Sequence, residues 1–207
     1  LFGSGGGAAL AADIEAPLLA SIPIDGAVAR GGDTGAPVVL GDGPAAEALR
    51  SLVELIEPEG AAVIKGEDRA WGGVGSRAPR ALSFGIDADD LDVRAVVEEL
   101  GPFGARFRLE TAEGAVNVES PLLGDFNVQN VLGAAATCLA LGFDPAEVAE
   151  RVATTPQVPG RLERIAVSPC PVLTDYAHTP DALDRVLAAL RPLVRGRLIV
   201  VFGAGGD

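Results

Sequence analysis

The second half of the chain contains four short motifs in a fixed order. They read Gly-Asp-Phe-Asn-Val-Gln-Asn-Val at residues 124–131, Pro-Gly-Arg-Leu-Glu at 159–163, Asp-Tyr-Ala-His-Thr-Pro-Asp-Ala-Leu at 175–183 and Gly-Ala-Gly-Gly-Asp at 203–207. The first and third motifs start apolar helical patterns, and the last motif follows an apolar run at 198–202 that predicts a buried strand. Helices that alternate with buried strands indicate an α/β fold.

The first motif predicts the beginning of a helix. Asp125 is expected to cap a helix that begins near Phe126, because the following apolar residues fall on one stripe: Val128, Val131, Leu132, Ala135 and Leu139. Asn127 and Asn130 are three residues apart, so they share another face near the helix N-terminus. Two amides there offer donors and acceptors that suit a base edge or a ribose. The alternative is that each amide bonds local backbone, as asparagines at helix starts often do.

The third motif predicts a strand end followed by a helix. Thr179 suits an N-cap, Pro180 suits the first helical position, and the carboxylate at 181 complements the helix dipole. Leucines and valine at 183, 186, 187 and 190 give that helix its apolar face.

Strands are expected at 162–167 and 172–174. Asp175, Tyr176 and His178 would then lie at the C-terminal edge of a parallel sheet, where α/β proteins usually bind ligands. His178 is the only histidine of the chain, and it is either a nucleotide contact or an ordinary loop donor.

Composition limits the possible partners. The chain has 207 residues, 48% of them hydrophobic, and 16 basic against 29 acidic residues give a net charge of −13. The absence of a basic cluster argues against binding to nucleic acid or through a polybasic membrane surface. Cys138 and Cys170 have apolar neighbours, which favours buried free thiols in a reducing cytosol. No apolar run reaches transmembrane length and no export signal is evident, so we expect a cytoplasmic protein without a membrane partner.

Residues 1–57 have a different character. A glycine-rich loop precedes an expected helix at 8–15, a strand at 17–23 and a helix at 44–56. No Gly-Lys-Ser/Thr follows the glycines, so they do not form a P-loop. The runs at 2–7, 17–25 and 31–38 resemble the C-terminal end of Mrp/NBP35-type ATPases, which carry iron–sulfur clusters. The Walker lysine and the cluster cysteines of that family are absent, so this resemblance implies no activity.

The middle of the chain alternates strands and helices. Strands are expected at 61–64 and 81–86 around a helical stretch near Trp71, which suggests parallel packing, and three further β runs at 92–97, 105–110 and 115–119. Arg106, Arg108 and Glu110 alternate with apolar residues, the pattern of a half-exposed antiparallel strand, and we assign these charges no function. Prolines at 156 and 159 and Gly160 indicate a linker at a domain boundary.

The four motifs, in this order, resemble those of the Mur ligases. The likeness covers roughly residues 58–207 and is strongest to the enzymes that add the third amino acid to UDP-N-acetylmuramoyl-dipeptide. It implies an α/β fold with part of a central ATP-binding domain at 58–158 and the start of a Rossmann-like C-terminal domain at 159–207. The ATPase-like residues 1–57 precede these domains as a short α/β segment. Carried over from the family motifs, the ATP-binding residues are Asn127, Asn130, Arg161 and Asp175, with Tyr176 and His178 beside them.

The resemblance also implies ATP and Mg²⁺, and as partners a UDP-N-acetylmuramoyl-peptide and an amino acid. No P-loop, catalytic residue or metal ligand can be identified, and Lys65, the only lysine, lies in Ile-Lys-Gly-Glu-Asp where the family more often has Asn-Ala-Asp-Asp. We therefore expect a ligase fragment that is inactive alone. Two other hypotheses stay open: a fusion protein that catalyses nothing, and an iron–sulfur carrier ATPase of the Mrp/NBP35 type.

Overall fold

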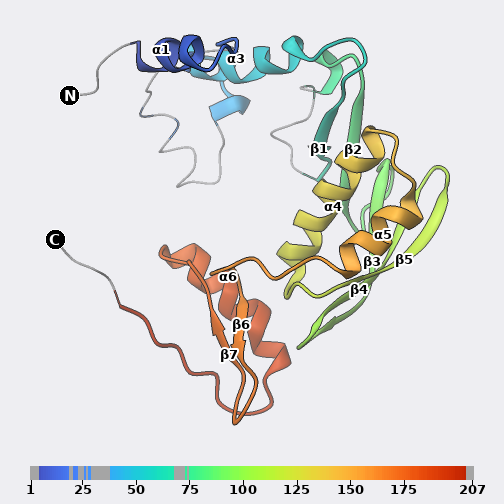
Figure 1. Ribbon diagram of the computed structural model, residues 1–207, viewed down its shortest axis with the longest axis vertical. Coiled ribbons are helices and arrows are strands. Elements are labelled where there is room, and N and C mark those ends of the chain that lie inside the picture. The colour runs from blue at the N-terminus through green and yellow to red at the C-terminus, as the bar shows by residue number, and fades with distance from the viewer. Residues whose placement is uncertain are drawn as a thin grey trace. The chain divides into compact units, whose positions relative to one another are not determined.

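The computed structural model describes residues 5–18, 21–22, 26, 28, 38–67, 73 and 75–203 (Figure 1). The chain divides into two compact units, Leu1–Phe84 and Gly85–Asp207, and each is described by itself. This division differs from the domain boundaries expected at 58 and 159, which stay predictions. Helices and strands occur in both units, so the mixed α/β class is confirmed.

The first unit contains short elements. These are α1 (Gly6–Asp13), η1 (Val38–Leu40), α3 (Pro44–Ser51), η2 (Leu52–Leu55), β1 (Ala62–Lys65) and η4 (Gly75–Arg77). Strand β2 (Ala81–Ile86) begins in this unit and ends two residues beyond its last residue, Phe84. Strands β1 and β2 pair in parallel, with Ala62 opposite Ala81, as the sequence predicts. The expected helix at 44–56 forms, but its last turn tightens to the 3₁₀ helix η2.

For the N-terminal segment, one expected strand is wrong, and other expectations fall on residues that the structure does not describe. The strand expected at 17–23 is wrong for the residues described there, because 17–18 and 21–22 lie outside helix and strand and Leu18 and Ile22 are exposed. A proline at position 17 lacks the N–H that a strand ladder needs. The helix near Trp71 and most of the ATPase-like motif positions lie outside the described residues.

The second unit begins with an antiparallel meander of β3 (Val93–Gly101), β4 (Gly104–Thr111) and β5 (Gly114–Ser120). The face that contributes to the core buries Val93, Ala95, Phe107, Leu109 and Val118. Helices α4 (Asp125–Ala140) and α5 (Pro145–Ala153) pack against β3 and β5, respectively (Figure 1). The alternation predicted for β4 is confirmed.

The other face of the meander carries the charges. Glu110 accepts hydrogen bonds from Arg94 Nε at 3.0 Å and from Arg108 Nε at 2.7 Å. These bonds, that of Arg94 first, hold the pKa of the Glu110 carboxyl below its usual range. The charges therefore satisfy one another across and along the strands.

Helix α4 begins one residue earlier than the sequence suggests. Its N-cap is Gly124, with φ of 88°, and Asp125 is the first helical residue, whose Oδ1 accepts from Phe126 N at 2.9 Å. The cap prediction for Asp125 is therefore wrong, because the chain reverses at the left-handed glycine. A Cβ at Gly124 would lie 2.9 Å from the Phe126 ring, so this turn needs glycine. The apolar stripe from Val128 to Ala135 is buried as expected.

The rest of the second unit is a hairpin covered by a helix. Strands β6 (Glu163–Ala166) and β7 (Val172–Thr174) pair antiparallel, and α6 (Pro180–Leu190) continues into η5 (Arg191–Leu193). Thr179 Oγ1 accepts from Ala182 N at 3.3 Å and Pro180 is at N1, so the predicted helix start is confirmed. The core of this part contains Leu123, Leu162 and Leu190.

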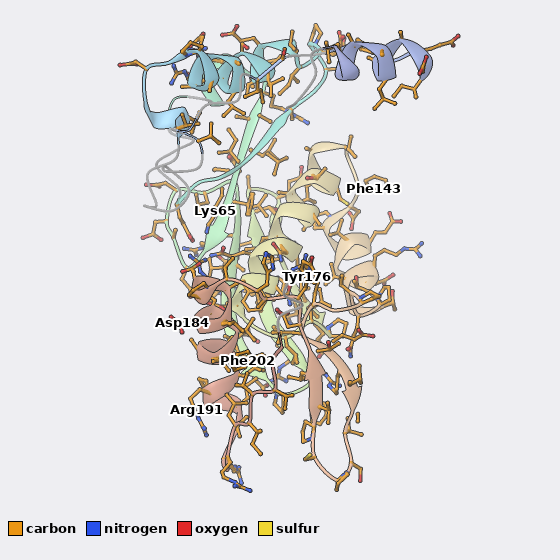
Figure 2. The ribbon with its side chains drawn as sticks, turned by 90° about the vertical axis from the view of Figure 1, so that its left-hand side faces the viewer. Lys65, Phe143, Tyr176, Asp184, Arg191 and Phe202 are labelled. Atoms are coloured by element: carbon orange, nitrogen blue, oxygen red, sulfur yellow. The ribbon has the colours of Figure 1, made fainter. Side chains whose placement is uncertain are left out.

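Two expectations for this part are corrected. Residues 198–202 are not a buried strand: they lie outside any strand, and Val201 and Phe202 are 94% and 82% exposed (Figure 2). Among the described residues β7 has only β6 beside it, so Asp175 follows an antiparallel strand and not the edge of a parallel sheet.

The cysteines also differ from expectation. Cys138 is half-buried in α4 and Cys170 is exposed, and both are free thiols. The prediction of a buried thiol is wrong for Cys170, because the turn between β6 and β7 leaves it uncovered. None of the helices described is both long and apolar enough to cross a bilayer.

Candidate functional site

The two asparagines at the start of α4 contact each other but have different surroundings. Asn127 is only 8% exposed, its Nδ2 donates to Leu123 O at 2.8 Å, and its Oδ1 accepts from Asn130 Nδ2 at 3.2 Å. Asn130 is exposed. The alternative of a local backbone bond thus holds for Asn127. Asn130 keeps its Oδ1 and one N–H for a ligand, which is the pair of groups that a base edge requires.

Asp175 joins the linker to the end of β7. Its Oδ2 accepts from Leu162 N at 2.8 Å and its Oδ1 accepts from Ala177 N at 2.8 Å. The carboxylate is half-buried, and each of its oxygens has a further lone pair. Asp175 can therefore fix the linker and still accept a hydrogen bond from a hydroxyl group.

Tyr176, labelled in Figure 2, contacts two other candidate residues. The Arg161 Cζ atom is 5.2 Å from the centroid of the Tyr176 ring, and the His178 ring meets it edge-on with centroids 5.2 Å apart. His178 Nδ1 is 3.0 Å from Tyr176 O. Because a carbonyl oxygen only accepts, the proton of this hydrogen bond comes from Nδ1, and Nε2 is left for a ligand. All three side chains are exposed and can reach a ligand.

An apolar cluster connects these two groups of candidates. Leu123, whose carbonyl holds Asn127, packs in the same cluster as Leu162, whose N–H is held by Asp175. The six candidate residues therefore form an amide pair and a linker group around shared leucines. Sequence reasoning missed Leu162, a buried residue with φ of 45°, which bulky residues rarely adopt. The preceding Pro-Gly pair was the signal for such a turn.

Within the described ranges, no three His, Cys, Asp or Glu side chains gather closely enough to hold a metal ion. Any cation there would need ligands from a bound phosphate or from elsewhere in the protein.

Comparison with known proteins identifies the family. Residues 45–138 match the Mur ligase middle domain, and residues 160–207 match the domain described as Mur ligase, glutamate ligase domain. The chain belongs to the Mur ligase family across these residues. Together the two matches cover more than half of the chain.

Relatives of the Mur ligase family support this assignment. The UDP-N-acetylmuramoyl-L-alanyl-D-glutamate–2,6-diaminopimelate ligase of Nostoc sp. is 37% identical over 172 residues, which are 79% of this chain and 34% of that protein. The enzyme of the same name from Gloeobacter violaceus is 40% identical over 160 residues, 76% of this chain and 30% of its own. A solved structure of a ligase of that name superposes with a TM-score of 0.64 at 32% identity, covering 79% of this chain and 35% of that one.

The chain spans about a third of the length of these Mur ligases. The likeness of residues 1–57 to Mrp/NBP35-type ATPases receives no support, and the middle-domain match begins inside that segment, at residue 45. The hypothesis of an iron–sulfur carrier ATPase is likewise unsupported by these relatives.

Proposed function

We propose that this chain supplies part of the nucleotide site of an ATP-dependent ligase that adds an amino acid to a UDP-N-acetylmuramoyl-dipeptide in the cytoplasm. The observation that carries the proposal is the match of both Mur ligase domains to residues 45–138 and 160–207. The relatives are named for UDP-N-acetylmuramoyl-L-alanyl-D-glutamate and 2,6-diaminopimelate, and we take these as the acceptor and the amino acid.

The reaction would proceed through an acyl phosphate. The dipeptide carboxylate attacks the terminal phosphorus of ATP and releases ADP, and the amine of the amino acid then attacks the acyl carbon and expels phosphate. Such chemistry depends mainly on positioning and on the neutralisation of phosphate charge. Magnesium would arrive with the phosphates, and we assign it no step here.

Each site residue would contact a different part of the nucleotide. Asn130 would bond the adenine edge, and Asn127 would orient it. The Arg161 guanidinium would offset phosphate charge, because its planar donors match phosphate oxygens. Asp175 would accept from a ribose hydroxyl with a lone pair that its backbone bonds leave free. The ring face of Tyr176 and Nε2 of His178 would complete the contacts.

Calorimetry with ATP and Mg²⁺ tests this proposal. We expect Asn130→Ala and Arg161→Met each to raise the dissociation constant for ATP about ten-fold, the size of one lost charge-assisted or base-edge contact. Asn127 and Asp175 are poor choices for this test, since their bonds to backbone make their substitutions structural as well.

Matched controls exist on the same unit. Asn117 is an exposed asparagine on β5, and Arg185 is an exposed arginine on α6 that pairs with Asp181. Asn117→Ala and Arg185→Met should leave the heat of binding unchanged. Absence of binding in the unmodified protein, or site variants that bind ATP as tightly as the unmodified protein does, would refute the assigned residues.

A further inference from the structure

The linker between α5 and β6 is irregular in structure, but two side chains, one in the linker and one at the start of β6, accept hydrogen bonds from nearby backbone N–H groups. Gly160 N donates to Glu163 Oε2 at 2.8 Å, and Arg164 N donates to Gln157 Oε1 at 2.7 Å. Both acceptor side chains are half-buried. These two bonds enclose Arg161, since one spans residues 160–163 and the other spans 157–164. A loop whose N–H groups are bonded in this way is restricted to few conformations.

The backbone on either side of Arg161 is also constrained. Gly160 has φ of 68° and Leu162 has φ of 45°, so Arg161 lies between two left-handed residues. Arg161 N itself donates to Val158 O at 3.0 Å, closing a tight turn. Leucine adopts such a φ only when its surroundings enforce it, and here Leu162 is 3% exposed and its N–H is bonded to a carboxylate. The direction in which Arg161 leaves the backbone is therefore set by its neighbours.

The Arg161 side chain, by contrast, is held lightly. It is exposed, and its one contact recorded in the described part of the chain is the Tyr176 ring, 5.2 Å from Cζ. An exposed arginine loses considerable conformational entropy when it binds an anion. Fixing its backbone beforehand lowers that cost.

We propose that Gln157 and Glu163 are positioning residues that hold Arg161 over Tyr176, so that its guanidinium is oriented before an anionic ligand arrives. That the anion is a nucleotide phosphate rests on the proposed function; the positioning itself does not. Neither residue needs to touch the ligand, because both act through the linker backbone.

Nuclear magnetic resonance without nucleotide tests the positioning directly. The Arg161 side-chain protons should show a ring-current shift from Tyr176. Gln157→Leu and Glu163→Leu, which remove the acceptors, should move these signals toward the values of Tyr176→Leu. Gln157→Glu and Glu163→Gln keep an acceptor oxygen, so the Arg161 signals of these two variants should stay where they are in the unmodified protein. Glu150→Leu, which removes an exposed carboxylate from α5, should have no effect. Arg161 signals unchanged in both leucine variants would overturn the proposal.

Comparing ATP with adenosine binding gives a second test. A general loss of stability would weaken the binding of both ligands, whereas a loss of Arg161 positioning would weaken only that of ATP. Gln157→Leu should raise the dissociation constant for ATP about 2- to 12-fold, the range expected for one side chain that must be immobilised on binding. It should leave adenosine binding unchanged and add nothing in an Arg161→Met background. An equal loss for adenosine, or full additivity with Arg161→Met, would contradict the coupling. If the unmodified protein binds no ATP, the proposed function fails, while the resonance test still decides the positioning.

Discussion

Asn127 and Asn130 carry the same side chain on the same helix turn, but the structure gives them different tasks. The Asn127 amide is buried and hydrogen-bonded to Leu123 O and to the Asn130 side chain, whereas the Asn130 side chain is exposed to solvent. Replacing Asn127 would therefore leave a buried acceptor unpaired and release its neighbour at the same time. Mutational data on this pair are informative about ligand contact only at Asn130.

Asp175 allows a test of its structural role. In Asp175→Asn one carboxylate oxygen becomes an amide nitrogen, so either Leu162 N or Ala177 N loses its acceptor. We expect the free energy of unfolding to fall by about 1–3 kcal/mol, the usual cost of losing a hydrogen bond to a charged group. Urea denaturation measures the change.

The control for this prediction is Asp184→Asn, since Asp184 is exposed on α6 (Figure 2). Its effect should stay within about 0.5 kcal/mol, as for most surface substitutions. Equal stability of Asp175→Asn and the unmodified protein would show that the linker does not depend on this carboxylate.

At the residue scale, the sequence indicated which residues matter at the start of α4 better than it indicated what each of them does. Spacing placed Asn127 and Asn130 together, but only the structure shows that Asn127 is buried and Asn130 exposed. Asp125 was expected to cap α4, and only the left-handed φ of Gly124 shows why it does not.

At the scale of elements, the two turns of the meander each contain a glycine with nearly the same φ, but the two glycines differ in how closely other atoms approach them. Gly104 and Gly114 have φ of 145° and 142°, respectively, but a Cβ at Gly104 would lie 1.9 Å from Ser120 O, while one at Gly114 would meet nothing within 4 Å. Both positions thus carry the same backbone strain on substitution, and only one adds a collision with backbone.

These two glycines form an internally controlled pair. Gly104→Ala should lower the free energy of unfolding by about 1–3 kcal/mol more than Gly114→Ala, which is the usual cost of overpacking. Thermal or urea unfolding of both variants measures the difference. Comparable losses in the two variants would mean that β5 yields at Ser120 and that the collision is relieved at little cost.

Local patterns predicted most of the strands and helices and the parallel pairing of β1 with β2, but they missed the partner of β7. The alternation in 105–110 identified β4, and Thr179-Pro180 identified the start of α6. The pairing of β6 with β7 could not be derived in this way, because three- and four-residue strands carry too little periodicity to specify a neighbour. Expecting a parallel sheet edge at Asp175 was therefore an error of pairing, while the strand itself was placed correctly.

At the scale of the whole molecule, the run at 198–202 combines five uncharged apolar residues with no proline. In the structure Val201 is 94% exposed and no strand pairs with this run among the described residues. Uncharged, exposed segments of high β propensity favour association between chains. We therefore expect the isolated chain to self-associate as its concentration rises.

Val201→Lys should reduce this self-association, because a charge within such a run opposes strand pairing. Sedimentation velocity over a range of concentrations measures it. Leu141→Lys is the matched control, since Leu141 is 73% exposed at the end of α4, outside the run at 198–202. If both lysine substitutions reduce self-association equally, the change in net charge is the cause, and the run at 198–202 does not drive the association.

The turn between β6 and β7 leaves Cys170 uncovered, while the other sulfur atom of the chain, in Cys138, is half-buried within a helix. A maleimide dye at limiting concentration should thus attach mainly at one place, on the tip of the hairpin that follows the linker. Labelling at that position would place a spectroscopic probe on the β6–β7 hairpin without any engineered thiol.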